Sequence, residues 1–568
     1  MRIMLLCSAF NGLSQRVWAE LRAAGHPVRI QPAGEADAMC AAVTDHQPDL
    51  IICPLLRERV PARIWQTYRT IIIHPGPPGD RGASSLDWAI LDGEREWGVT
   101  ALQAVEEMDA GPIWGSRTFP IDPAEPPRKS SLYSGPVADA AIELVHEILA
   151  KAADPAFVPT PLDYRRPDVR GRLRPTMRQS DWEFSWSDPT ATILRRIRAA
   201  DGSPGVRTTL AGAAVSVFDA HPGPALPGRP GDILCRSHGA VLVRTGDAAV
   251  WIGHLRRAGG QALKLPATLA LHDRLPEVPV ALAGHHDIGH REISYRRRGP
   301  VGVLSFAFYN GAMSTGQCDR LAAALRVAAA QDTRVLVLRG GETFANGIHL
   351  NVIEAAPDPE IEAWHNIQAI DDVCREIITC TGQLVVASVG GNAGAGGVML
   401  ALGADRVLVR TGVMLNPHYR TMGLYGSEYW TYVLPRRVGA HRAESLAGRC
   451  EPVDAQEAVR IGLVDDALAG LPAAFEEAVL EYATRLATRA DHSNLVERKR
   501  AARAADEQRR PLESYRAEEL ALMQLDIFED RRGFAAARHA FVHKRARSAG
   551  RDGRSAWSLL PTPGPAAA

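Results

Sequence analysis

The stretch from Ile71 to Gly82 constrains the fold and function of this chain more than any other part of the sequence. It reads IIIHPGPPGDRG, so three β-branched residues are followed by a run rich in proline and glycine. β-Branched residues favour a buried strand, and the Pro/Gly run forces an irregular loop after it. This pattern predicts that His74 lies at the carboxyl end of a strand, where open α/β sheets bind ligands.

A carboxylate follows in a second turn-like segment, MDAG at residues 108–111. Asp109 in this segment could pair with His74, and a histidine–carboxylate pair is suited to acid–base chemistry. The alternative is a histidine that ends a strand and an aspartate that favours a turn, both of which are common. On spacing alone, both interpretations stay open.

The segment HPGPPGDRGASSLDWAILDGEREWGVTALQAVEEMDAGPI resembles the catalytic segment of folate-dependent formyltransferases. That family includes methionyl-tRNA formyltransferase and the hydrolases of 10-formyl-tetrahydrofolate. The matching positions are His74, Arg81-Gly82, Trp88-Ala89-Ile90, Gly98-Val99-Thr100, Asp109 and Gly111. One position departs, because Ile72 stands where the family has asparagine. The resemblance implies that His74 and Asp109 are catalytic, and that Ile72 gives the site an altered polarity.

The length of 568 residues exceeds what one hydrophobic core usually organises, so roughly two to four domains are expected. With 46% hydrophobic and 23% charged residues, the composition is that of a soluble globular protein. The formal net charge is zero, which gives no bias toward nucleic acid or membrane partners. Eight scattered cysteines without a C-x-x-C pair indicate free thiols in a cytoplasmic protein, with no disulfide framework and no metal site.

No membrane segment is expected. The apolar start of the chain is too short for a signal peptide. The uncharged stretch at 384–404 has the length of a membrane span but contains six glycines and Asn392. It therefore predicts a strand, a glycine loop and a helix.

The first domain is expected at residues 1–165, as an open parallel sheet with covering helices. Apolar runs at 2–7, 28–30 and 50–54 alternate with helical patterns at 13–24 and 35–44. The loop that opens the first helix is a natural place for ligand contacts, although it lacks the dinucleotide fingerprint. Asn11, Gln15 and Arg16 are therefore candidate cofactor-binding residues. Ser131, at the start of a later helix, is another, with simple helix capping as its alternative.

Residues 163–176 are rich in arginine and proline and predict a linker. Short β-like runs between 213 and 255 then predict a β-rich module at 166–275. This module resembles the small β-barrel subdomain of several folate formyltransferases. A second linker is expected at 276–297, and the Gly/Pro/Ala-rich residues 548–568 are expected to be a disordered tail.

Two glycine-rich loops organise the C-terminal half. GGETFANGIHL at 340–350 follows a strand-like run, and SVGGNAGAGGV at 388–398 opens a helix. Such loops leave backbone N–H groups accessible, and two together can form an oxyanion hole, although ordinary tight turns are the alternative. Both loops resemble those of the crotonase (enoyl-CoA hydratase) superfamily over roughly 298–470. The resemblance implies a ββα superhelix domain at 298–547 with terminal helices, and oxyanion-hole N–H groups at Ile348 and Gly396.

The catalytic carboxylates of the hydratases are missing, because Met399 and Tyr419 stand at their positions. A methionine cannot act as an acid or base, so a hydratase is not expected. Tyr419 and Glu428 are the candidates for proton handling, with aromatic core packing and a surface glutamate as the alternative. The resemblance also implies coenzyme A binding, for which Asn310 and the basic C-terminal helices, including Arg538, are candidates. A solvated basic face is the alternative for those helices.

The pairing of a formyltransferase-like half with a crotonase-like half resembles the HypX/HoxX family of NiFe-hydrogenase maturation proteins over nearly the whole chain. That resemblance implies formyl transfer from 10-formyl-tetrahydrofolate to coenzyme A, followed by decarbonylation of formyl-CoA to CO and CoA. It also implies hydrogenase maturation proteins as partners. Two alternatives remain: a formyl-CoA synthase and hydrolase that releases formate, and a non-catalytic scaffold that binds folate and CoA.

Overall fold

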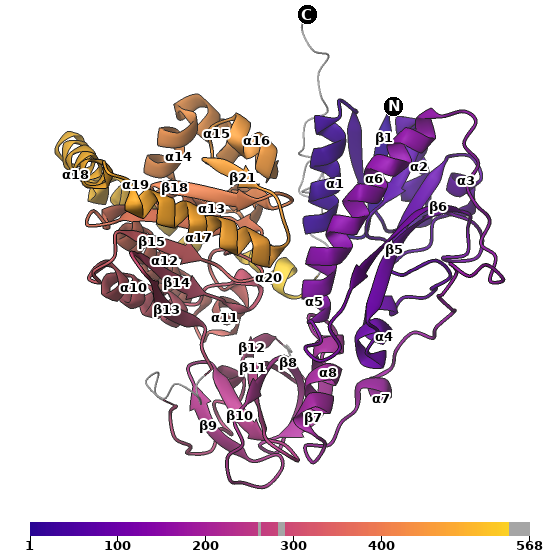
Figure 1. Cartoon of the computed structure of the whole chain (residues 1–568), viewed down its shortest axis with the longest axis horizontal. Helices are drawn as coiled ribbons and strands as arrows, with labels where there is room; N and C mark the ends of the chain where they lie inside the picture. Colours follow the sequence, from indigo (N-terminus) through magenta and orange to yellow (C-terminus); the bar gives the residue numbers. More distant parts are fainter. Residues whose placement is uncertain (260–262, 282–289, 545–568) are drawn as a thin grey trace, which may run out of the picture. The chain divides into compact units, whose positions relative to one another are not determined.

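Figure 1 shows the computed structural model of the chain, which describes residues 1–259, 263–281 and 290–544. The chain divides into two compact units, with the boundary between His290 and Arg291. The predicted tail at 548–568 lies outside the described residues, as do residues 282–289 of the predicted second linker.

The N-terminal unit begins with a six-stranded sheet in the order β2-β1-β3-β4-β5-β6. The elements of this part are β1 (Ile3–Cys7), α1 (Gly12–Ala23), β2 (Val28–Pro32), α2 (Ala36–His46), β3 (Leu50–Cys53), α3 (Ala62–Trp65), β4 (Thr70–His74), α4 (Ser85–Asp92), β5 (Glu96–Gln103), β6 (Ile113–Pro120), α5 (Lys129–Leu132), the π-helical turn η1 (Tyr133–Val137) and α6 (Ala138–Ala153). The predicted parallel order is confirmed for β1 to β4. Two antiparallel strands, β5 and β6, extend the sheet beyond them.

The central strands of this sheet are buried on both faces, which explains their continuous apolar sequences. Met4 and Leu6 of β1 join Ile51 and Cys53 of β3 in a core shared with α2 and α3. Helix α6 packs against β5 and β6 and contacts α1 (Figure 1). His74 is the last residue of β4, so the loop that follows starts at the carboxyl end of a central strand, as predicted.

The second part of the N-terminal unit is the predicted β-rich module. Its elements are α7 (Gln179–Trp182), α8 (Thr190–Ala200), β7 (Val206–Leu210), β8 (Ala213–Gly223), β9 (Ile233–Ser237), β10 (Ala240–Arg244), β11 (Ala249–Arg257), β12 (Lys264–Pro266) and α9 (Ala267–Ala270). The strands pair antiparallel in the order β7-β8-β11-β10-β9, with β12 on β11. Strands β7 and β12 were not predicted, because the polar sequence VRTTL and the three-residue sequence KLP show too little alternation of apolar and polar residues.

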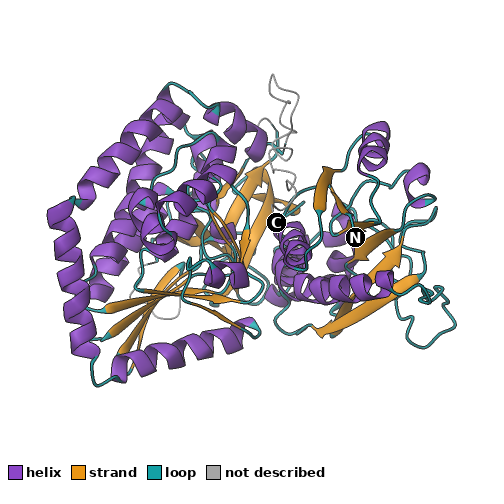
Figure 2. Ribbon diagram, turned by 90° about the horizontal axis from the view of Figure 1, so that it is seen from above, coloured by secondary structure: helices purple, strands orange, loops and turns teal. Residues whose placement is uncertain are grey.

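The helices of the C-terminal unit gather around its strands, as Figure 2 shows. Its elements are β13 (Ile293–Arg298), β14 (Val301–Phe306), the 3-10 turn η2 (Tyr309–Gly311), α10 (Thr315–Ala329), β15 (Val335–Arg339), α11 (Leu350–Ala355), α12 (Pro359–Thr379), β16 (Leu384–Val389), β17 (Ala393–Gly394), α13 (Gly396–Leu402), β18 (Arg406–Arg410), β19 (Met414–Asn416), the 3-10 turn η3 (Tyr419–Met422), α14 (Trp430–Val438), α15 (Ala440–Arg449), β20 (Val453–Asp454), α16 (Ala455–Arg460), β21 (Asp466–Leu468), α17 (Pro472–Thr488), α18 (His492–Arg509), α19 (Leu512–Phe528) and α20 (Phe534–Val542).

These strands form a six-stranded sheet, β13-β14-β15-β16-β18-β21, and a small sheet, β17-β19-β20. Alternate residues of the large sheet enter different cores. Val335 and Val337 of β15 pack against α17, whereas Leu336 and Leu338 belong to the larger core that contains α10 and α12. Both faces are covered, so β15 reads as an unbroken apolar run.

The predicted linker at 276–297 is wrong at its C-terminal end. Residues 293–297 belong to β13, which pairs antiparallel with β14 from Ile293 opposite Phe306 to Arg298 opposite Val301. Three consecutive arginines at 296–298 conceal this strand in the sequence, because an edge strand tolerates charged side chains.

The stretch at 384–404 forms β16, β17 and α13, as predicted. No helix in the described ranges is long and apolar enough to cross a membrane.

Candidate active sites

In the N-terminal unit, His74 lies between two carboxylates. Its Nε2 atom is 2.9 Å from Oδ2 of Asp80, and its Nδ1 atom is 3.6 Å from Oδ1 of Asp109. The three side chains are 5%, 0% and 14% exposed, respectively, so solvent screens these contacts little. Burial lowers the pKa of His74, but the hydrogen bond to Asp80 and the charge of Asp109 outweigh it and raise the pKa. A readily charged imidazole in this position can stabilise an oxyanion and transfer a proton.

The surrounding loop has the sequence that this geometry requires. A Cβ atom at Gly76 would lie 2.3 Å from Oδ2 of Asp80 and 2.6 Å from Nε2 of His74, so only glycine fits there. Asp109 adopts φ 55° in its turn, and its Oδ2 atom accepts a hydrogen bond of 3.2 Å from the Gly82 N–H. The loop after β4 and the turn that carries Asp109 therefore close around the histidine.

Asp80 is a site residue that the sequence pattern did not single out, because a Pro/Gly loop does not reveal where its aspartate points. The segment at 163–176, predicted to be a linker, packs against the same loop. The Gly171 N–H donates to the Pro78 carbonyl at 2.9 Å, and Nε of Arg174 lies 3.9 Å from Oδ1 of Asp80. Arg174 thus gives the buried Asp80 carboxylate a second cationic neighbour.

Ile72, the departure from the formyltransferase pattern, lies in β4 two residues before His74. Its half-buried side chain packs against the apolar core beside α2 and α3. Residues two apart in a strand share a face, so Ile72 and His74 project to the same side of the sheet. An isoleucine offers no side-chain donor, and any oxyanion contact must come from His74 or the backbone.

Two of the predicted cofactor-binding residues, Asn11 and Gln15, stabilise the loop that opens α1. Asn11 caps the helix, since its Oδ1 atom accepts from the Ser14 N–H at 3.0 Å, and its Nδ2 atom donates to the Tyr133 hydroxyl at 3.3 Å. The Nε2 atom of Gln15 donates to the Phe10 carbonyl at 3.0 Å.

The two other candidates of this domain, Arg16 and Ser131, differ in whether their polar groups are already paired within the protein. Arg16 forms an ion pair of 2.5 Å with Asp139 of α6, and its side chain is 14% exposed. A ligand anion would therefore compete with Asp139. The Ser131 hydroxyl is buried and has no hydrogen-bond partner within the described ranges, which leaves it able to bind a ligand atom.

In the C-terminal unit, the two predicted oxyanion-hole residues come together. Ile348 lies in the loop before α11, and Gly396 is the first residue of α13. The loops are close enough that a Cβ atom at Gly347 would lie 3.3 Å from the Gly396 nitrogen. In the described part of the chain, neither the Ile348 nor the Gly396 N–H has a protein acceptor. Two unengaged amides from adjacent loops suit a carbonyl oxygen that gains negative charge.

Tyr419 and Glu428 are also adjacent. The Tyr419 hydroxyl donates to Oε2 of Glu428 at 2.8 Å, and the Ser427 hydroxyl and N–H donate at 3.0 and 3.2 Å. Glu428 is 2% exposed, so the alternative of a surface glutamate is wrong. Its Oε1 atom would lie 2.0 Å from a Cβ atom at Gly396, which places the carboxyl directly beside the proposed oxyanion hole. Burial raises the pKa of Glu428 more than these hydrogen bonds lower it.

Two further buried acids hold the turn that carries Glu428. Glu428 and Tyr429 have φ values of 63° and 57°, a costly conformation for residues other than glycine. Asp371 of α12 accepts from the Glu428 N–H at 2.7 Å, and Glu519 of α19 accepts from the N–H groups of Tyr429 and Thr431 at 2.9 and 2.8 Å. Burial, with the charge of Glu428 adding to it, raises the pKa of Asp371 to about 8. Helical periodicity does not distinguish these acids from solvent-exposed ones, so the sequence did not indicate them.

The two predicted coenzyme A contacts have different surroundings. Asn310 lies in η2 with φ 55° and an exposed side chain, and its carbonyl accepts from Nδ2 of Asn346 at 2.8 Å. Arg538 is only 5% exposed, its Nε atom is 2.7 Å from Glu354, and its Nη2 atom is 3.7 Å from Glu360. The buried face of α20 turns Arg538 inward, and its Nη1 atom is buried without a hydrogen-bond partner in the described residues.

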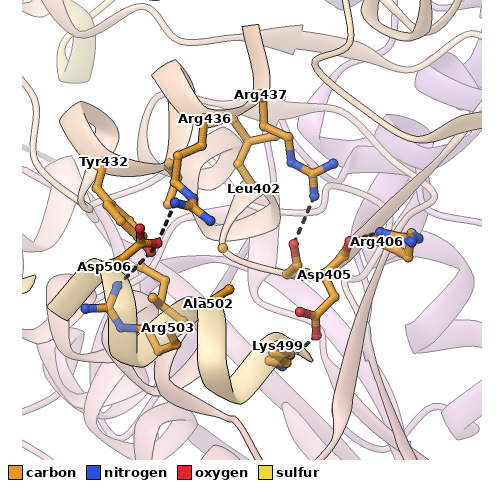
Figure 3. A pocket seen from close by; sticks show the side chains of 14 residues that line it. Leu402, Asp405, Arg406, Tyr432, Arg436, Arg437, Lys499, Ala502, Arg503 and Asp506 are labelled. Atoms are coloured by element: carbon orange, nitrogen blue, oxygen red, sulfur yellow. Dashed lines mark hydrogen bonds and ion pairs between the residues drawn. The ribbon is translucent and has the colours of Figure 1, made fainter. Parts of the chain in front are cut away.

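A separate cavity of about 590 Å³ lies between the end of α13, α14 and α18 (Figure 3). Its basic side chains are paired with carboxylates, including Lys499 with Asp405 and Arg436 with Asp506, both at 2.5 Å. None of the oxyanion-hole or proton-handling candidates lines it. The basic charge predicted for α18 is therefore largely neutralised at this cavity.

Comparison with known proteins gives matches to both halves. Three family models match: formyl transferase over residues 18–134, formyl transferase C-terminal domain over 176–272, and enoyl-CoA hydratase/isomerase over 308–548. The hydrogenase maturation factor HoxX of Bradyrhizobium diazoefficiens is 44% identical over 551 residues, 96% of each chain. A methionyl-tRNA formyltransferase of Trichlorobacter lovleyi is 28% identical over 251 residues, 44% of this chain and 77% of the other. The crystal structure of HypX from Aquifex aeolicus in complex with tetrahydrofolic acid has a TM-score of 0.92 at 40% identity and covers 96% of both chains.

Proposed function

Because this chain belongs to the HypX/HoxX family of hydrogenase maturation factors, with formyltransferase domains joined to an enoyl-CoA hydratase-like domain, we propose that it produces carbon monoxide in two steps. The first step transfers a formyl group from 10-formyl-tetrahydrofolate to the thiol of coenzyme A. The second step converts formyl-CoA into CO and CoA. Both would take place in the cytoplasm, and the CO would serve hydrogenase maturation.

The first step needs a thiol proton removed and a tetrahedral oxyanion stabilised. A thiol of pKa about 8.5, by analogy with cysteine, requires only modest activation. Asp109 would accept that proton, and Nδ1 of His74, which does not bond to Asp80, would donate a hydrogen bond to the oxyanion in place of the missing asparagine. The proton then passes to N10 of the departing tetrahydrofolate. Asp80 supports this assignment because it fixes the imidazole and favours its charged form.

The second step breaks two bonds of formyl-CoA. Glu428 removes the proton from the formyl carbon, the carbon–sulfur bond breaks, and CO leaves. Tyr419 delivers a proton to the thiolate and regains one from Glu428. The amides of Ile348 and Gly396 hold the carbonyl oxygen. The step is redox-neutral because CO and a thiol together have the composition of a formyl thioester.

One observation carries the second step: a buried carboxyl lies beside two unengaged backbone amides and accepts a hydrogen bond of 2.8 Å from a tyrosine. For substrate binding, we assign Ser131 to the first site, Asn310 to coenzyme A, and supporting roles to Asn11 and Gln15. Arg16 would reach an anion only after its ion pair with Asp139 opens.

The test of the first step is the rate of formyl-CoA formation. His74→Ala and Asp109→Ala should each lose ~10²–10⁴-fold while retaining the native fold, because each removes a positioned acid–base group. His146→Ala, on the exposed face of α6, is the matched control and should keep the wild-type rate. Near-normal transfer by both site variants would refute the assignment. Formate in place of CO would indicate the hydrolase alternative, and binding without turnover would indicate the scaffold.

A further inference from the structure

Two histidines four residues apart, His539 of α20 and its C-cap residue His543, face a single glutamate of α11. Nδ1 of His539 is 2.7 Å from Oε1 of Glu354, and Nε2 of His543 is 3.5 Å from the same oxygen. The three potential ligand atoms all lie within 4.8 Å of one another. Residues four apart share a helix face, so the end of α20 presents both imidazoles together.

The environment of these side chains suits a bound ion. The Glu354 side chain is 8% exposed, that of His543 13% and that of His539 37%. Nε2 of His543 is buried and has no hydrogen-bond partner in the described residues. Two imidazole nitrogens and one carboxylate oxygen form a common zinc ligand set, with the fourth position left for water. We propose that Glu354, His539 and His543 bind a divalent transition-metal ion such as Zn²⁺.

Arg538 completes the arrangement. It contacts Oε2 of Glu354, the oxygen that does not face the histidines, and its guanidinium lies 5.1 Å from the Phe534 ring centroid. Outer contacts of this kind orient a ligating carboxylate and fix which oxygen meets the metal. Its burial suits this positioning role.

A second histidine–carboxylate group, Asp219 with His221 and His290, is a weaker candidate. Arg128 lies 3.5 Å from Oδ1 of Asp219, the same oxygen that contacts His221 at 2.9 Å, and His254 occupies the other oxygen at 3.0 Å. The positive charge of Arg128 therefore already lies beside the Asp219 oxygen that would have to bind a metal ion. At Glu354 the arginine lies on the opposite oxygen, which leaves Oε1 to the histidines.

The consequence of a metal at this site would be structural. Helix α11 begins two residues after Ile348, so an ion held by α11 and α20 would fasten the C-terminal helix beside the oxyanion loop. The sequence pattern predicted no metal site because Glu354 is distant in sequence from both histidines.

The test uses the full-length chain without a histidine tag, stripped of metal and titrated with ZnCl₂ in a calorimeter. One Zn²⁺ should bind per chain and raise the melting temperature. His539→Ala and Glu354→Gln should each weaken binding at least ~10-fold, and Arg538→Ala ~10–100-fold. His365→Ala, on the exposed face of α12, is the control and should bind as the wild type does.

Co²⁺ absorption of the unmutated protein provides evidence that does not depend on any variant folding. An intense ligand-field spectrum of four-coordinate Co²⁺ should appear and be displaced by one equivalent of Zn²⁺. Absence of stoichiometric Zn²⁺ binding, or wild-type affinity in His539→Ala, would overturn the proposal. Loss of binding in His221→Ala alone would also overturn it, since the ion would then belong to the Asp219 group.

Discussion

Replacing Glu428 with glutamine should stop CO release and leave formyl transfer to coenzyme A intact. Glutamine keeps the size of the side chain and can still accept from the Tyr419 hydroxyl, but it cannot take a proton from the formyl carbon. Loss of a positioned base costs ~10²–10⁴-fold in rate. Tyr419→Phe removes the group that delivers a proton to the thiolate, so a loss of the same ~10²–10⁴-fold is expected.

The stability of the glutamine variant distinguishes a chemical defect from a folding defect. The pKa of Glu428 is raised in the folded protein, chiefly by burial. Its contribution to stability is therefore present below the unfolded value of 4.5 and is lost as pH rises through the folded pKa. Glu428→Gln removes this titration, so the variant should lose less stability than the wild type as pH rises above 4.5. Chemical denaturation across that range measures the difference.

The assay follows three products from one reaction: CO in the headspace, and formyl-CoA and formate in solution. Formyl-CoA or formate should accumulate in both variants while CO falls. Glu444→Gln, on the exposed face of α15, is the matched control and should leave CO unchanged. Undiminished CO from Glu428→Gln and Tyr419→Phe would refute the reasoning.

Three further substitutions test other parts of the two sites. Asp80→Asn should lower the pKa of His74, because the acceptor of the hydrogen bond that raises this pKa loses its negative charge. The limb of the pH–rate profile for formyl transfer that reports His74 should then move to lower pH. An unchanged profile would show that the two residues are not coupled. Ile72→Asn adds a donor on the strand face that carries His74 and should change the rate or the preference between coenzyme A and other acceptors; unchanged kinetics would make this position peripheral. Gly396→Ala places a methyl group 2.0 Å from the Glu428 carboxylate oxygen and should abolish CO formation but not formyl transfer. Gly382→Ala, where the added carbon meets no neighbour within 4 Å, is the control and should have no effect. CO production by Gly396→Ala at the wild-type rate would contradict the oxyanion-hole assignment.

Features set by local chemistry could be predicted from the sequence. Apolar runs predicted strands β1, β3 and β4, and the Pro/Gly run predicted that His74 ends β4. The glycine loops indicated an oxyanion hole, because accessible backbone is a property of the loop itself, and the resemblance to the crotonase superfamily pointed to Ile348 and Gly396 within them. Tyr419 and Glu428 became candidates because the resemblance places Met399 and Tyr419 at the positions of the usual carboxylates.

Features set by long-range packing could not be predicted. Asp371 and Glu519 lie on helices remote in sequence from Glu428, and only the fold brings them to its backbone. The burial of Arg538 could not be predicted because a basic residue on a helix is usually exposed, whereas here α20 buries it against Glu354. Asp80 was in the recognised motif, but its contact with His74 depends on how the irregular loop folds back.

The most direct test of the proposed chemistry is headspace CO from the purified full-length protein supplied only with 10-formyl-tetrahydrofolate and coenzyme A. The two-step scheme predicts one CO for each tetrahydrofolate formed, over many turnovers, with coenzyme A regenerated. Formate in equal amount to tetrahydrofolate, without CO, would contradict it.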